Sequence, residues 1–87
     1  MNMLITARHC RIDDELRELT RSRLERVLRK AHRPHRVEVI FSRDADRSVV
    51  EVQLYVPRAK VFVCKADADD FRTALDRALD KLQNHLD

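Results

Sequence analysis

Hydrophobic and polar residues recur with a regular spacing along most of the chain, and the spacing changes from one segment to the next. The run MLITA, residues 3–7, is a short strand candidate. After Asp13, which is suited to cap a helix, hydrophobic residues recur at the spacing of an α-helix until Pro34 stops the pattern. These residues are Leu16, Leu19, Leu24, Val27, Leu28 and Ala31. We therefore expect a strand followed by an amphipathic helix.

The next three segments alternate between hydrophobic and polar residues, as half-buried strands do. Their aligned hydrophobic positions are Val37, Val39 and Phe41, then Val50, Val52, Leu54 and Val56, then Phe62, Cys64 and Ala66. A polar loop, RDADRS, separates the first two segments, and the turn PRA separates the last two. A second helix is predicted from about Asp69, with a hydrophobic stripe made of Phe71, Ala74, Leu75, Ala78, Leu79, Leu82 and Leu86.

The order of these elements predicts an α+β fold of the βαβββα type. The first helix would be a right-handed crossover between two parallel strands, and the remaining strands would form an antiparallel meander. Both helices can then pack on one face of a four-stranded mixed sheet, within a single domain of residues 1–87. The opposite face would carry Leu4, Thr6, Glu38, Ile40, Val49, Glu51, Gln53, Tyr55, Val61, Val63 and Lys65. We expect this open face to be a partly apolar sheet surface, with weak self-association through it as the alternative.

Composition narrows the class of protein further. Hydrophobic residues make up 44% of the chain and charged residues 38%, which suits a soluble domain without a membrane span. No secretory signal is visible at the N-terminus, which favours the cytoplasm, where the thiols of Cys10 and Cys64 would stay unpaired.

The absence of glycine excludes a P-loop and a dinucleotide-binding fingerprint, and no catalytic pair stands out. We expect neither an enzyme nor a cofactor. The pair His32 and His35 lacks further ligands nearby, so no metal site is predicted.

Positive charge is concentrated in the first half of the chain. Residues 8–36 carry ten Arg or Lys against five Asp or Glu, a net charge of +5, whereas residues 37–87 carry eight against ten, a net charge of −2. On the first predicted helix, four basic residues fall within about 80° of one another beside the hydrophobic stripe. This basic ridge consists of Arg23, Arg26, Lys30 and Arg33. We expect the ridge to be largely unpaired.

Charge is segregated on the second predicted helix as well. Arg77 and Lys81 lie four residues apart on one flank, and Asp76 and Asp80 lie four apart on the other. Like charges at this spacing destabilise an isolated helix slightly, so a binding partner for the basic flanks would explain the pattern. Ordinary solvated helix flanks are the alternative. The acidic run DADDF is interpreted as a helix cap and first turn, since carboxylates stabilise the N-terminal end of a helix.

Three segments together resemble a known family. The run IDDELRELTRSRLERV, the run RVEVIF and the final DDFRTALDRALDKLQNHL look like the ribosome hibernation-promoting factor and ribosome-associated inhibitor family, also called the sigma-54 modulation protein family. The resemblance covers nearly the whole chain, and this sequence matches a short form. Many relatives have glycine where this chain has Ala68. The resemblance implies the same βαβββα fold.

The resemblance also implies a function. We expect a stress or stationary-phase factor that binds the small ribosomal subunit and its rRNA in the channel for mRNA and tRNA, and so inhibits translation. Arg23 and Arg26 then correspond to basic positions of the family's first helix, and Lys81 to a lysine of the last helix. The predicted rRNA-binding residues are Arg23, Arg26, Lys30, Arg33, Arg77 and Lys81. The alternatives are a protein-binding modulator of the alternative sigma factor and a generic double-stranded RNA-binding module.

Overall fold

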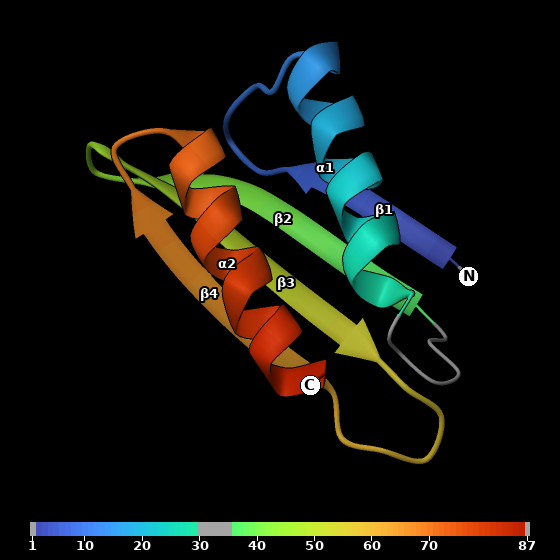
Figure 1. Ribbon diagram of the computed structural model, residues 1–87. Coiled ribbons are helices and arrows are strands. Elements are labelled where there is room, and N and C mark those ends of the chain that lie inside the picture. The colour runs from blue at the N-terminus through green and yellow to red at the C-terminus, as the bar shows by residue number, and fades with distance from the viewer. Residues whose placement is uncertain (1, 30–35, 87) are drawn as a thin grey trace.

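Four strands form one mixed sheet, and two helices cover one of its faces (Figure 1). The computed structural model describes residues 2–29 and 36–86. In chain order the elements are β1 (Asn2–Ala7), α1 (Asp14–Leu28), β2 (Arg36–Asp44), β3 (Arg47–Tyr55), β4 (Phe62–Ala68) and α2 (Phe71–Leu86). The predicted α+β fold and its βαβββα order are confirmed.

The strands lie in the order β1-β2-β3-β4, so β1 and β4 are the two edges of the sheet. β1 pairs with β2 in parallel, with Asn2 opposite Arg36, and the other two pairings are antiparallel. The hairpin between β2 and β3 is tighter than the polar loop predicted from the sequence. Asp44 pairs with Arg47, which leaves only Ala45 and Asp46 in the loop. The strands extend into the polar segment because backbone pairing does not require hydrophobic side chains at a solvent-exposed hairpin end.

The hydrophobic core lies between the two helices and the sheet. The hydrophobic stripes of both helices supply buried residues, and the aligned positions of β2, β3 and β4 face them. Phe41 is fully buried and meets the ring of Phe71 edge to face, with 5.4 Å between the ring centroids. Burying a large hydrophobic side chain contributes about 1.5–3 kcal/mol, so this layer supplies most of the stability.

Thr20 is a buried polar residue that the hydrophobic pattern does not indicate. It is fully buried on α1, and its hydroxyl donates a hydrogen bond of 2.8 Å to the carbonyl oxygen of Leu16. This bond satisfies the hydroxyl within the helix, so its burial leaves no unpaired polar group.

Aspartates cap the N-terminal ends of both helices. The carboxylate of Asp13 accepts a hydrogen bond of 2.8 Å from the backbone N–H of Leu16, as the sequence predicts. In α2, Asp70 accepts one of 2.8 Å from the N–H of Thr73, and the helix begins at Phe71 rather than at Asp69. The helix starts later because Asp70 acts as its cap and therefore precedes its first turn. Ala31, the last predicted position of the first helix, and Pro34, which the sequence predicts to stop it, lie outside the described residues.

Three turns place non-glycine residues in the left-handed region of backbone conformation. His9, Ala45 and Arg58 have φ angles of 57°, 55° and 64°. A side chain with a Cβ atom is strained there, by about 1–2 kcal/mol, and glycine is the usual choice. Because the chain has no glycine, its tight turns retain this strain.

The open face of the sheet combines apolar side chains with a chain of polar contacts. Leu4, Val61 and Val63 are 43%, 44% and 52% exposed. Tyr55 donates a hydrogen bond of 2.8 Å to Gln53, which in turn donates one of 2.6 Å to Glu51. Self-association through this face remains a prediction.

Candidate nucleic-acid interface

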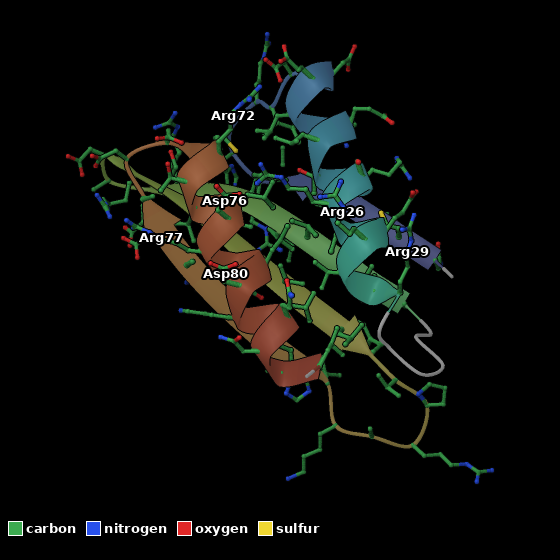
Figure 2. All side chains as sticks on the ribbon, viewed as in Figure 1. Arg26, Arg29, Arg72, Asp76, Arg77 and Asp80 are labelled. Atoms are coloured by element: carbon green, nitrogen blue, oxygen red, sulfur yellow. The ribbon has the colours of Figure 1, made fainter. Side chains whose placement is uncertain are left out.

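The two helices lie side by side on the sheet, and a groove separates their outer surfaces (Figure 2). The groove is lined by Arg23, Arg26, Val27, Asp76, Leu79, Asp80 and Gln83. The basic flank of α1 therefore faces the acidic flank of α2. The segregation of Arg23 and Arg26 on α1 and of Asp76 and Asp80 on α2 has an explanation within the molecule, because these two flanks carry opposite charges and face each other.

Two ion pairs cross between the helices. Arg23 of α1 pairs with Asp76 of α2, and Arg72 Nη2 lies 3.0 Å from Glu15 Oε1 near the start of both helices. The expectation of a largely unpaired ridge is therefore wrong for Arg23. A helical wheel places residues on the flank of one helix but does not show which flank of the other helix lies opposite. The ion pairs hold Arg23 and Arg72 at the surface of the helical layer.

Arg26 is the most accessible of the described ridge residues. Its side chain is exposed and lies one turn beyond Arg23, beside the same groove. Figure 2 shows it on α1, across from Asp76 and Asp80 on α2. Among the described residues, no carboxylate oxygen lies within ion-pair distance of Arg26. Its guanidinium, with five N–H donors, can therefore contact an anionic ligand directly.

The other half of the predicted ridge, Lys30 and Arg33, lies outside the described residues, as do His32 and His35. α1 ends at Leu28, with Arg29 as its C-cap. Lys30 and Arg33 thus remain sequence-based candidates.

Arg77 and Lys81 lie on the opposite flank of α2, beside the edge strand β4. Arg77 Nη1 donates a hydrogen bond of 2.8 Å to the carbonyl oxygen of Asp67, and Lys81 Nζ donates one of 2.6 Å to that of Lys65. Asp76 and Asp80 lie on the other flank, toward the groove. The structure therefore brings Arg23 and Arg26 together but separates them from Arg77 and Lys81 by an acidic row.

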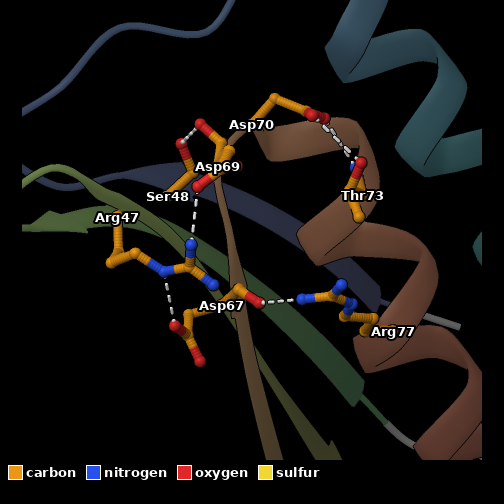
Figure 3. A network of polar contacts seen from close by, with 7 residues as sticks. All are labelled: Arg47, Ser48, Asp67, Asp69, Asp70, Thr73 and Arg77. Carbon is orange, nitrogen blue, oxygen red and sulfur yellow. Dashed lines mark hydrogen bonds and ion pairs between the residues drawn. The ribbon is translucent and has the colours of Figure 1, made fainter.

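A polar network at the start of α2 accounts for most of the acidic run DADD (Figure 3). Arg47 Nε donates a hydrogen bond of 2.9 Å to Asp67 Oδ2, and its Nη1 donates one of 2.6 Å to Asp69 Oδ1. The hydrogen bond with Arg47 lowers the pKa of Asp67 and raises the pKa of Arg47. Hydrogen bonds from Thr73, the backbone N–H foremost, lower the pKa of Asp70. The acidic run thus anchors β3, β4 and α2 to one another.

Arg47 is a structural residue that sequence reasoning missed. It stands in the predicted polar loop, yet it contacts carboxylates 20 and 22 positions away along the chain. The signal that could have found it is the antiparallel pairing of β3 with β4, which places Ser48 opposite Ala68 and therefore brings Arg47 near Asp67 and Asp69.

The described residues also include potential metal ligands, two cysteines and two helices that bear on other kinds of site. No group of three His, Cys, Asp or Glu side chains in residues 2–29 and 36–86 is arranged to hold a metal ion. Cys10 and Cys64 are free thiols. Cys64 is buried, its Sγ donates to the carbonyl oxygen of Ala78, and burial raises the pKa of its thiol. Neither described helix is long and apolar enough to span a membrane.

Comparison with solved structures finds the same fold in two known proteins. The structure is similar to a ribosomal subunit interface protein from Coxiella burnetii, with a TM-score of 0.90 and 24% identity over 99% of this chain and 93% of that one. It is also similar to the N-terminal domain of Protein Y from Thermus thermophilus, with a TM-score of 0.84 and 24% identity over 99% of this chain and 96% of that one. These two likenesses establish the fold. Comparison with curated proteins gives no match.

The family assignment rests on the sequence itself. A family model described as sigma 54 modulation protein / S30EA ribosomal protein matches residues 3–87, nearly the whole chain. This match confirms the resemblance to the ribosome hibernation factors that the two helices and the second strand carry. The chain therefore belongs to the sigma 54 modulation protein / S30EA ribosomal protein family, a family of ribosome-associated proteins.

Proposed function

We propose that this protein is a non-enzymatic, cytoplasmic stress factor that occupies the mRNA and tRNA channel of the small ribosomal subunit and inhibits translation. The observation that carries the proposal is the family match over residues 3–87. The exposed basic flank of α1 supports it, because a cationic surface on a rigid helix is suited to phosphate groups of rRNA. The domain of residues 1–87 would act as one binding unit.

Arg26 is the residue best placed to contact rRNA. It is exposed at the rim of the groove, whereas Arg23 is paired with Asp76 and must leave or share that carboxylate to bind a phosphate. Lys30 and Arg33, which lie outside the described residues, are proposed to contact rRNA as well. Arg77 would contribute from the far flank of α2, because one N–H of its guanidinium bonds the carbonyl of Asp67 and the others remain available. Lys81 would act beside it.

Charge reversal of Arg26 tests the proposal. We expect Arg26→Glu to weaken co-sedimentation with small ribosomal subunits strongly while leaving the fold intact, because the residue is exposed. The matched control is Arg58→Glu, an exposed residue of the turn between β3 and β4 that does not line the groove. Arg47 is unsuitable as a control because its ion pairs with Asp67 and Asp69 stabilise the fold. Equal losses in both variants would show that only net charge matters.

Salt dependence provides a second test. If about four phosphates are contacted, tripling the salt concentration should weaken binding by roughly 20- to 50-fold, since each neutralised phosphate releases counterions. Binding to isolated small and large subunits should be measured in parallel. Salt-insensitive binding, or an equal affinity for large subunits, would contradict a phosphate-lined site on the small subunit.

A modulator of the alternative sigma factor is the second candidate, because the family description names sigma 54. The two functions differ in where the protein is found in stationary-phase cells. A ribosome-binding factor migrates with ribosomal particles in a sucrose gradient, whereas a sigma-factor modulator stays near the top.

A further inference from the structure

The free edge of β4 exposes the backbone groups of alternate residues. Asp44 and Arg47 flank the two-residue hairpin loop as a hydrogen-bonded pair, so the N–H and C=O groups of Arg47 point toward β2. Because these groups alternate in direction along a strand, those of odd-numbered β3 residues point toward β2 and those of even-numbered β3 residues point toward β4. The register of Val50 with Ala66 then directs the even-numbered residues of β4 toward β3. The N–H and C=O groups of Lys65 and Asp67 therefore point away from the sheet.

Two cationic side chains of α2 cover these outward carbonyls. Lys81 Nζ donates a hydrogen bond of 2.6 Å to the carbonyl oxygen of Lys65, and Arg77 Nη1 donates one of 2.8 Å to that of Asp67. The four-residue spacing of Arg77 and Lys81 on the helix matches the two-residue spacing of outward carbonyls along the strand. A helix rises about 1.5 Å per residue and a strand about 3.3 Å per residue, so the two spacings have nearly equal lengths.

The other edge of the sheet, formed by β1, has a similar contact. Arg8 donates its backbone N–H to the carbonyl of Phe41 in β2, so the even-numbered residues of β1 point toward β2 and Ile5 points away. Arg17 Nη1 of α1 donates a hydrogen bond of 3.0 Å to the carbonyl oxygen of Ile5. Both edges thus carry a cationic side chain from the adjacent helix on an outward carbonyl.

We propose that Arg77 and Lys81 seal the β4 edge against strand pairing with a second copy of this chain. An antiparallel two-fold pairing centred on Ala66 would place Lys65 opposite Asp67 of the second copy, twice. Lys65 would then lie on the open face opposite a carboxylate that an arginine of the second copy also contacts, so opposite charges face each other. The hydrogen bonds of this pairing need the carbonyls of Lys65 and Asp67 as acceptors. These are the carbonyls that Lys81 and Arg77 cover, so the pair is blocked until both side chains leave.

This role goes beyond ribosome binding, and it can be tested without ribosomes. The double variant Arg77→Met and Lys81→Met keeps long, helix-compatible side chains but removes the donors. We expect it to dimerise at least about tenfold more tightly than the wild type in sedimentation velocity, because each lost hydrogen bond corresponds to a factor of about 2–10. In hydrogen exchange, the amides of Lys65 and Asp67 should become protected in the dimer.

Two further variants make the test decisive. Adding Lys65→Pro removes an outward N–H and leaves the pairing with β3 intact, so it should return the double variant to a monomer. The control pair Arg21→Met and Arg26→Met removes the same charge from exposed positions of α1 and should leave self-association unchanged.

If the double variant Arg77→Met and Lys81→Met stays monomeric and is folded by circular dichroism, the proposal is overturned. A dimer that survives Lys65→Pro would overturn it as well, since such a dimer would use another surface. If the double variant does not fold, the single variants are expected to show the same change more weakly, and unchanged association in both would overturn the proposal.

Discussion

The proposed role of Arg23 in rRNA binding, together with its ion pair with Asp76, predicts that one substitution changes ribosome affinity and stability in opposite directions. Asp76→Asn removes the carboxylate that holds Arg23 and keeps a side chain of similar size. The Arg23 and Asp76 side chains are 37% and 55% exposed, and pairs this accessible to solvent are worth about 0.2–1 kcal/mol. The free energy of unfolding should therefore fall by about that amount.

The same substitution should strengthen ribosome binding. In the wild type, Arg23 must leave or share Asp76 to contact a phosphate, which forfeits about 0.2–1 kcal/mol. A carboxylate about 8 Å from a phosphate adds a repulsion of about 0.5 kcal/mol in water, which salt reduces. Removing both effects predicts an affinity higher by about 2- to 10-fold.

The assay is titration of a fluorescently labelled protein with purified small ribosomal subunits, alongside urea unfolding. The matched control is Asp46→Asn at the tip of the β2–β3 hairpin, which makes the same change of net charge away from the groove. An unchanged or lower affinity for Asp76→Asn would refute the reasoning. An equal gain for Asp46→Asn would show that net charge alone is responsible.

Three further predictions concern the fold. Ala45→Gly should raise the free energy of unfolding by up to about 1 kcal/mol in a urea titration, because glycine relieves the strain at a φ of 55°; a loss of stability would contradict this strain. Arg47→Gln should destabilise the protein most above about pH 5 and progressively less below about pH 4. The reason is that the lowered pKa of Asp67 contributes stability that is present above the unfolded pKa of about 3.9 and is lost as the pH falls through the folded pKa. A difference in stability between the variant and the wild type that does not vary with pH would contradict this linkage. Cys10 should react with iodoacetamide in the native protein much faster than buried Cys64, the pKa of whose thiol is raised, and equal rates would contradict the burial.

The fold could be predicted from the sequence because each element has one dominant hydrophobic period. Alternation in β2 and β3 identified Val39, Phe41, Val50 and Val52 as core residues, and all four are fully buried. Element ends were less predictable, because capping depends on a single side chain. Asp70 caps α2, so the helix begins at Phe71 rather than at about Asp69.

The candidate site was only partly predictable. Helical spacing placed Arg23 and Arg26 on one flank, as the structure does. It could not reveal the ion pair of Arg23 with Asp76, because that contact depends on how the two helices lie against each other on the sheet. The hydrogen bond from Lys81 to a backbone carbonyl could not be predicted either, since every residue has a carbonyl oxygen and the sequence does not indicate which of them a lysine contacts.

The parallel pairing of β1 with β2 has a consequence for the order of folding. β2, β3 and β4 are joined by short connections and can pair early, whereas the pairing of Asn2 with Arg36 must close a long loop that contains α1. Loop-closure entropy delays such contacts, so we expect β1 and α1 to dock last and to open first in the native state. The helix that carries Arg23 and Arg26 would then belong to the most labile unit of the protein. Slow steps in refolding would be seen first as delayed recovery of ribosome binding.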